Sequence, residues 1–94
     1  MDAMIDDEVT VVRSTSVLSN HTDGAIVMMD IDSGAYYDLE ASAAVIWELI
    51  DTPTTMGSIC SALEARFAVD RSRCRSDVSL FLNDLARKGL VKLT

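Results

Sequence analysis

Residues 16–39, SVLSNHTDGAIVMMDIDSGAYYDL, decide the fold of this chain. They hold three short runs rich in β-branched, aliphatic and aromatic residues, separated by Thr22-Asp23-Gly24 and Asp32-Ser33-Gly34. Each separator ends in glycine, which tight hairpin turns favour because it adopts a positive φ without strain. The pattern predicts an antiparallel meander over residues 16–21, 25–31 and 35–39.

Two features of this meander stay open at the level of sequence. The apolar run Val9–Val12 can add a fourth strand, so the sheet has three or four. Both faces of the 25–31 segment are apolar, which makes it the central strand or gives its outer face to a partner.

After Leu39 the apolar period changes from two residues to that of a helix. Ser42 is the expected N-cap of a first helix, buried on most sides, which ends at the segment 51–55. A second helix follows over 56–67 with one clean apolar stripe. A third runs from the N-cap Asp70 to Gly89, and residues 90–93 can form a short last strand. The predicted class is therefore α+β: a three-stranded antiparallel sheet followed by three helices.

A chain of 94 residues with 49% apolar residues describes one small domain, assigned to residues 9–94. The acidic stretch 1–8 is expected to be flexible. It does not resemble a signal peptide, and no apolar run reaches the length of a membrane span, so we expect a cytoplasmic protein that makes no membrane contact. Free thiols are expected at Cys60 and Cys74.

The charge is divided unevenly along the chain. Residues 1–64 hold twelve acidic residues and one basic residue, whereas residues 65–94 hold seven basic and three acidic residues. Arg71, Arg73 and Arg75 at the start of the third helix allow a DNA-binding winged-helix regulator as the alternative function. The acidic surroundings of these arginines favour a protein that does not bind nucleic acid.

No residue pattern predicts catalysis, a metal site or a cofactor. His21 is the single histidine and lies beside a turn, and Cys60 lies on a core stripe. Cys74 lies between two arginines near a helix N-terminus, where its pKa could fall, but no second histidine is available to complete a catalytic set. The scattered His and Cys positions also lack the spacing of a zinc site.

The third helix carries more apolar surface than a core needs. Its core stripe contains Cys74, Val78, Phe81, Leu82 and Leu85. A second stripe places Leu80 beside Asp77, Phe81, Asp84 and Lys88 at helical spacings. A stripe that mixes apolar and charged residues is typical of a groove wall, although a solitary exposed leucine is the simpler interpretation.

Taken in order and spacing, five segments resemble the PqqD-like proteins, the recognition elements of pathways that modify ribosomally made peptides. These segments are Gly34–Glu40, Ala44–Asp51, Asp77–Leu82, Leu85 and Gly89–Val91. The resemblance covers residues 14–93. One departure is Glu40, where the family often has Asn or Asp.

The resemblance implies a winged-helix-like fold that binds the leader segment of a precursor peptide. In the family the leader adds a strand to the sheet edge and lies between the third strand and the third helix. The partner would be a separate leader peptidase, cyclase or other modifying enzyme, with lasso-peptide biosynthesis as the preferred pathway. The quinone cofactor pathway that gave the family its name, or one built on a radical enzyme, would look similar in these residues.

The binding residues implied by the resemblance come from two elements. Those on the strand are Ala35, Tyr36, Tyr37 and Asp38. Those on the helix are Val78, Leu80 and Phe81, which would form apolar walls of the groove, and Arg73, Asp77 and Asp84, which would form its charged rim. Alternation places the two tyrosines on opposite faces without telling which one faces the groove. The apolar back of the sheet, with Ile26, Met28 and Met29, allows a homodimer.

Overall fold

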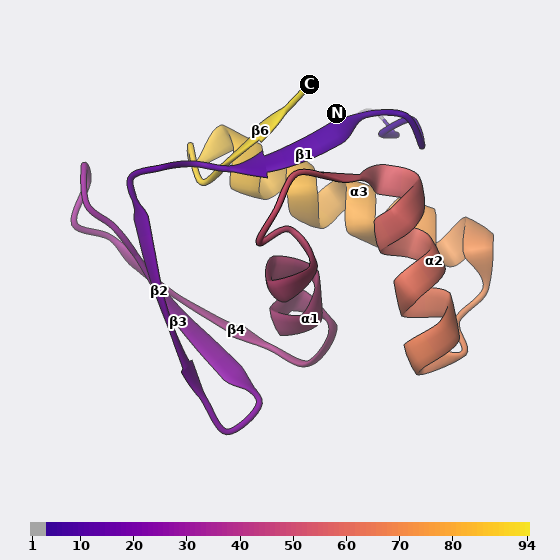
Figure 1. Ribbon diagram of the computed structural model, residues 1–94, viewed down its shortest axis with the longest axis horizontal. Helices are drawn as coiled ribbons and strands as arrows, with labels where there is room; N and C mark the ends of the chain where they lie inside the picture. The colour runs from indigo at the N-terminus through magenta and orange to yellow at the C-terminus, as the bar shows by residue number, and fades with distance from the viewer. Residues whose placement is uncertain (1–3) are drawn as a thin grey trace.

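The predicted meander forms in the computed structural model, which describes residues 4–94 (Figure 1). Its strands are β2 (Val17–Thr22), β3 (Ala25–Asp30) and β4 (Tyr36–Glu40), in the antiparallel order β2-β3-β4. The turn glycines Gly24 and Gly34 have φ of 80° and 75°, as the hairpin interpretation requires. The predicted α+β class, with a three-stranded antiparallel sheet and three helices, is confirmed.

The three helices follow the sheet as expected. They are α1 (Ala41–Leu49), α2 (Met56–Phe67) and α3 (Arg71–Arg87). The side chains of Thr55 and Asp70 cap α2 and α3 by accepting hydrogen bonds from the backbone amides of Ser58 and Arg73. Among residues 4–94, no helix has the length and hydrophobicity to cross a membrane.

The prediction that Ser42 caps the first helix is wrong. The helix already begins at Ala41, which has a φ of 52°, so Ser42 lies within its first turn. Glu40 occupies the cap position without a side-chain cap hydrogen bond, because strand β4 runs directly into the helix. The strand–helix junction is therefore a sharp backbone turn in place of a capped start.

The apolar run at 9–12 does not extend the meander. It forms β1 (Thr10–Arg13), which pairs with β5 (Thr54–Thr55) on one side and β6 (Val91–Leu93) on the other. The backbone amide of Ser14 donates to the carbonyl of Leu90, so the chain is bonded to its own C-terminal segment where it turns toward β2. The last predicted strand is thus confirmed, within a second small sheet (Figure 1).

The core lies between the inner face of the meander and the helices. Ile26 and Met28 of β3 point into it, almost completely buried, and belong to one hydrophobic cluster with residues of all three helices. Trp47 of α1 is also buried, and the Arg13 guanidinium lies 4.4 Å from the centre of its ring and donates to its carbonyl. Helices α1 and α3 therefore cover only one face of the three-stranded sheet.

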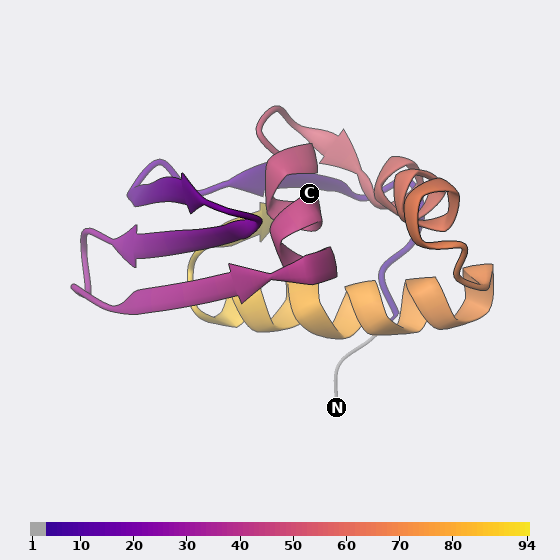
Figure 2. The ribbon, with the colours of Figure 1, turned by 90° about the horizontal axis from the view of Figure 1, so that it is seen from below.

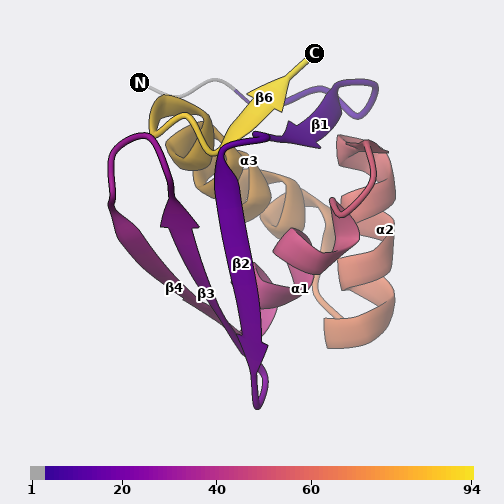
Figure 3. The same ribbon diagram turned by 60° about the vertical axis from the view of Figure 1, so that its left-hand side comes forward.

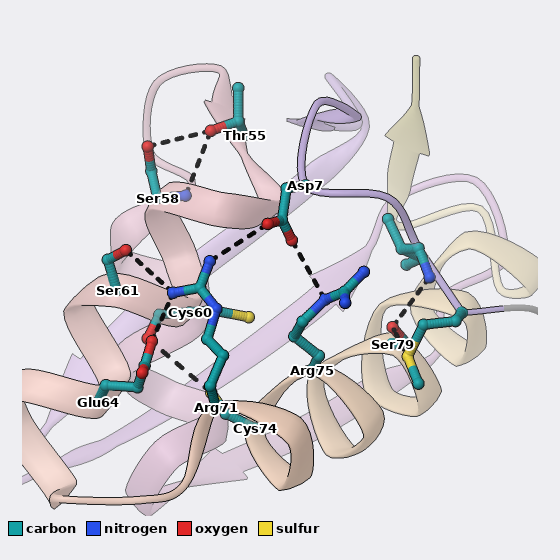
Figure 4. Close-up of polar contacts among 12 residues, drawn as sticks. Asp7, Thr55, Ser58, Cys60, Ser61, Glu64, Arg71, Cys74, Arg75 and Ser79 are labelled. Carbon is teal, nitrogen blue, oxygen red and sulfur yellow. Dashed lines mark hydrogen bonds and ion pairs between the residues drawn. The ribbon is translucent and has the colours of Figure 1, made fainter.

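Residues 4–8 pack against α3, and Figure 4 shows Asp7 beside Arg71 and Arg75 of that helix. Ile5 is buried, and its backbone amide donates to Oγ of Ser79 at 3.0 Å. The Asp7 carboxylate is 3.3 Å from Arg71 and 3.2 Å from Arg75. The flexibility of residues 1–8 stays a prediction, and these contacts argue against it for the described part; residues 1–3 lie outside the described residues.

Removal of the Ile5 side chain tests this packing directly. We expect Ile5→Ala to lower the free energy of unfolding by about 2–3 kcal/mol, because it leaves a cavity in the core. Met4→Ala is the matched control, since Met4 is exposed and its loss should cost less than about 0.5 kcal/mol. The measurement is urea denaturation of both variants. An Ile5→Ala variant as stable as the control would mean that residues 4–8 do not pack in solution.

The two cysteines are free, buried neighbours at the contact of α2 with α3. The Cys74 thiol lies 3.9 Å from the carbonyl oxygen of Cys60. Burial, reinforced by the adjacent Cys74, raises the pKa of the Cys60 thiol to about 12. The thiol therefore remains protonated in the folded protein, which is consistent with a structural cysteine.

This raised pKa makes the fold sensitive to alkali. Between about pH 9 and about pH 12 the unfolded chain loses the Cys60 proton and the folded chain keeps it, so stability falls as pH rises. The free energy of unfolding should therefore decrease across that window because of the Cys60 proton. Urea titrations of wild type and Cys60→Ala at several pH values isolate this contribution, since the variant should lack it. Parallel pH profiles for the two proteins would contradict the prediction.

Candidate functional site

An apolar cavity of about 200 Å³ opens between the three helices. Its walls are the first turns of α1, the end of α2 with the link that follows it, and the N-terminal half of α3. The lining residues are Ser42, Ala43, Ile46, Leu63, Phe67, Val69, Arg73, Cys74, Asp77, Val78 and Phe81.

The cavity combines an apolar interior with a charged rim. Phe67 and Val69 remain 40% and 39% exposed although they are large and apolar, so a hydrophobic surface is already presented there. Arg73 and Asp77 form an exposed ion pair of 3.6 Å at the rim. An apolar side chain of a ligand can enter the cavity, while the neighbouring positions of that ligand meet one positive and one negative group.

Further along α3, a second charged group meets β4. The Lys88 ammonium is 2.8 Å from the Asp84 carboxylate and 5.3 Å from the centre of the Tyr37 ring. The hydrogen bond from Lys88 lowers the pKa of Asp84, so this carboxylate is charged at neutral pH. The contact places the start of β4 beside the C-terminal half of α3, as Figure 2 shows.

Strand β4 presents an open edge of the sheet, because its paired neighbour is β3 alone. The amide of Asp30 donates to the carbonyl of Ala35, and in an antiparallel ladder the bonded pairs recur at every second residue. Tyr37 therefore bonds toward β3, whereas the backbone groups of Tyr36 and Asp38 point away from it. These groups form a template for another extended chain.

The structure decides the orientation of the two tyrosines. Leu39 is buried in the core, and Tyr37, two residues before it, packs on the same inner face next to Lys88. Tyr36 lies on the opposite face and is 71% exposed. Tyr37 therefore lies on the inner face of the sheet, toward α3.

The remaining predicted residues separate into two groups. Arg73, Asp77, Val78 and Phe81 come together at the cavity. Leu80 does not line the cavity, and it is 57% exposed on the solvent side of α3.

Several lining residues were missed by the sequence reasoning. Ala43, Phe67 and Val69 line the cavity but are not among the binding residues that the resemblance implies. The available signal was that Phe67 and Val69 follow one another across a helix end, where apolar residues gain little from a local core. Lys88, which the sequence places on the same stripe of α3 as Leu80, is not among those binding residues either.

One polar contact elsewhere involves the single histidine of the chain. Nδ1 of His21 lies 3.3 Å from the Glu48 carboxylate on the surface. Within residues 4–94, no three His, Cys, Asp or Glu side chains are grouped so as to hold a metal ion.

The fold and the site define a small α+β domain with an open sheet edge beside a helix-lined apolar cavity. Residues 25–91 match the family model of coenzyme PQQ synthesis protein D (PqqD). The chain belongs to the PqqD family, which confirms the resemblance found in the sequence. A search of curated protein sequences found no significant match.

Two solved structures are similar to this chain. One is TbiB1 in complex with the TbiA(beta) leader peptide, with 32% identity and a TM-score of 0.83 over 86% of this chain and 94% of that one. The other is a lasso peptide synthetase B1 complexed with the leader peptide, with 23% identity and a TM-score of 0.76 over 87% of this chain and 96% of that one. The second likeness is one of fold.

Proposed function

We propose that this protein binds the leader segment of a ribosomally synthesised precursor peptide, in lasso-peptide biosynthesis or a related peptide-modifying pathway. The observation that carries the proposal is the open β4 edge next to an apolar cavity, in a chain that is 32% identical to a protein solved with a leader peptide.

In the proposed complex the leader pairs with β4 as an additional strand. The backbone groups of Tyr36 and Asp38 supply hydrogen bonds that do not depend on the leader sequence, and Ala35 marks the start of the edge. Leader side chains that point inward lie over Tyr37 and Phe81, and one apolar side chain enters the cavity beside Val78.

The charged groups of α3 provide selectivity. Arg73 and Asp77 border the cavity. Asp84 and Lys88 lie further along α3, beside the start of β4. A leader that places a charge of the same sign beside one of these groups loses affinity, because like charges at close range repel each other. Leu80 lies beside Asp77 and Asp84 on the solvent side of α3. It would contact only a leader that extends across this solvent-exposed side of the helix.

The protein, in this proposal, is a binding partner without catalytic activity. It holds the leader so that a separate leader peptidase, cyclase or other modifying enzyme meets the rest of the precursor at a high effective concentration. This role needs no cofactor.

DNA binding is the alternative, and the ion pairs of α3 disfavour it. Arg71 bonds to Glu64 at 2.5 Å and to Asp7, Arg75 bonds to Asp7, and Arg73 pairs with Asp77. Each arginine that could contact phosphates is already neutralised by a carboxylate of the same chain, which removes the electrostatic gain of DNA binding.

The test is a fluorescence anisotropy titration with the labelled leader half of the precursor encoded in the same gene cluster. We expect a Kd at or below the low micromolar range, worth about 8 kcal/mol, that excess duplex DNA leaves unchanged. No binding of the leader, together with a salt-sensitive DNA signal, would favour the DNA-binding alternative.

A further inference from the structure

We propose that the outer face of the β2-β3-β4 sheet docks the enzyme that receives the leader-bound precursor. The partner surface would have an apolar centre and a rim of lysine or arginine. This inference rests on the proposed leader binding and adds a second, separate surface to it.

A row of apolar side chains crosses the outer face. Leu18 pairs with Met29, and Met29 pairs with Tyr36, so the three side chains are cross-strand neighbours. Leu18 is 56% exposed, and Ile31, which lies on the same face beyond β3, is 53% exposed. Figure 3 looks toward this side of the sheet, with α1 and α3 behind it.

Leu18, Tyr36 and Ile31 are exposed, and Met29, which lies between Leu18 and Tyr36, is half-buried. Of the three residues that the sequence allows on the back of the sheet, Ile26 and Met28 point inward and are buried in the core. Alternation along β3 leaves Met29 on the outside. Exposed apolar residues that adjoin one another on a flat sheet, in contrast to scattered single ones, are typical of a protein interface.

The charge around this row selects the partner. The chain has no lysine or arginine between Arg13 and Arg66. The exposed acidic residues Asp23, Asp32, Asp38 and Glu40 lie in or beside the sheet. Face-to-face association of two copies would bring these carboxylates together, whereas a partner with a basic rim would pair with them.

The position of the row relative to β4 identifies the partner as the leader-processing enzyme. A leader strand paired with β4 would extend the sheet, and every second leader side chain would join the face that carries Tyr36. An enzyme docked there touches protein and leader at once. The enzyme would therefore bind more tightly to the protein with a leader in place than to the free protein. It would then find the precursor already bound beside it.

The experiment uses Leu18→Glu, with Met4→Glu as the matched control. Met4 is an exposed apolar residue on α3's side of the molecule, with an exposure of 52%. Two quantities are measured for each protein: the leader Kd by anisotropy, and the rate at which the leader-processing enzyme encoded in the same cluster converts the precursor at limiting enzyme.

We expect Leu18→Glu to bind the leader within about twofold of wild type and to lower the conversion rate about tenfold or more, as for a central interface residue. Met4→Glu should match wild type in both measurements. The wild-type rate should also fall with added NaCl, because the rim contacts are ionic.

The outcomes separate the two proposals. A Leu18→Glu variant that converts precursor as fast as wild type, with leader binding intact, overturns the docking surface and leaves leader binding standing. A wild-type protein that binds no leader overturns both. A wild-type dimer in solution that Leu18→Glu converts to a monomer assigns the face to a second copy and also overturns the docking proposal.

Discussion

Replacing Asp38 by proline is expected to weaken leader binding tenfold to a hundredfold while the domain stays folded. The Asp38 amide points away from β3, so proline there removes no hydrogen bond of the sheet. It does remove a donor to the leader and leaves a leader carbonyl unpaired, which costs about 1–3 kcal/mol. The leader Kd by anisotropy and the urea midpoint of the free domain measure the two effects.

The control for this variant is Asp38→Ala, which removes the same carboxylate and keeps the amide. Its leader affinity should lie close to that of wild type, apart from the change in charge. Equal affinities for the proline and alanine variants would show that no leader hydrogen bond is made at Asp38, and β4 would then not be the edge that the leader joins.

Filling the cavity should have an effect of similar size. Ala43→Phe places an aromatic ring in the space of about 200 Å³ that the proposal gives to an apolar leader side chain. Excluding one such side chain from burial costs about 1.5–3 kcal/mol, which corresponds to binding weaker by about tenfold to a hundredfold. The free domain should keep its stability, since the ring fills a space that is open to solvent.

Ala65→Phe is the matched control, because Ala65 lies on the exposed side of α2 and does not line the cavity. It adds the same ring without closing the site, so its leader Kd should equal that of wild type. If Ala43→Phe also binds with wild-type affinity, the leader does not use the cavity, and its side chains contact only the surface of α3.

Local signals account for what the sequence predicted of the fold. Gly24 and Gly34 define the hairpins within a few residues, and Asp70 marks the start of α3 through one side-chain hydrogen bond. The pairing of β1 has no local signal of this kind, because its partner residues Val91–Leu93 are far along the chain. Alternation predicted that the two tyrosines lie on opposite faces of the sheet. Only the burial of Leu39 in the core shows that Tyr37, and not Tyr36, is on the inner face.

The site was predictable only in part for the same reason. The stripe on α3 is a property of one helix, so Asp77 and Phe81 could be identified from spacing, whereas Val78 lies on the core stripe and is implied only by the family resemblance. The opposite wall comes from Ala43 and Phe67, which meet α3 only after the chain has folded. A cavity between three helices has no periodicity in the sequence.

The pairing of β1 with β6 has a consequence for synthesis of the chain. Val11 pairs with Leu93, so β1 cannot complete its pairing until residue 93 has been synthesised. The β2-β3-β4 hairpins need no residue beyond Glu40 and can form while translation continues. Because the second sheet closes over the longest span, a nascent chain would complete its core only after residues 91–93 have emerged from the ribosome.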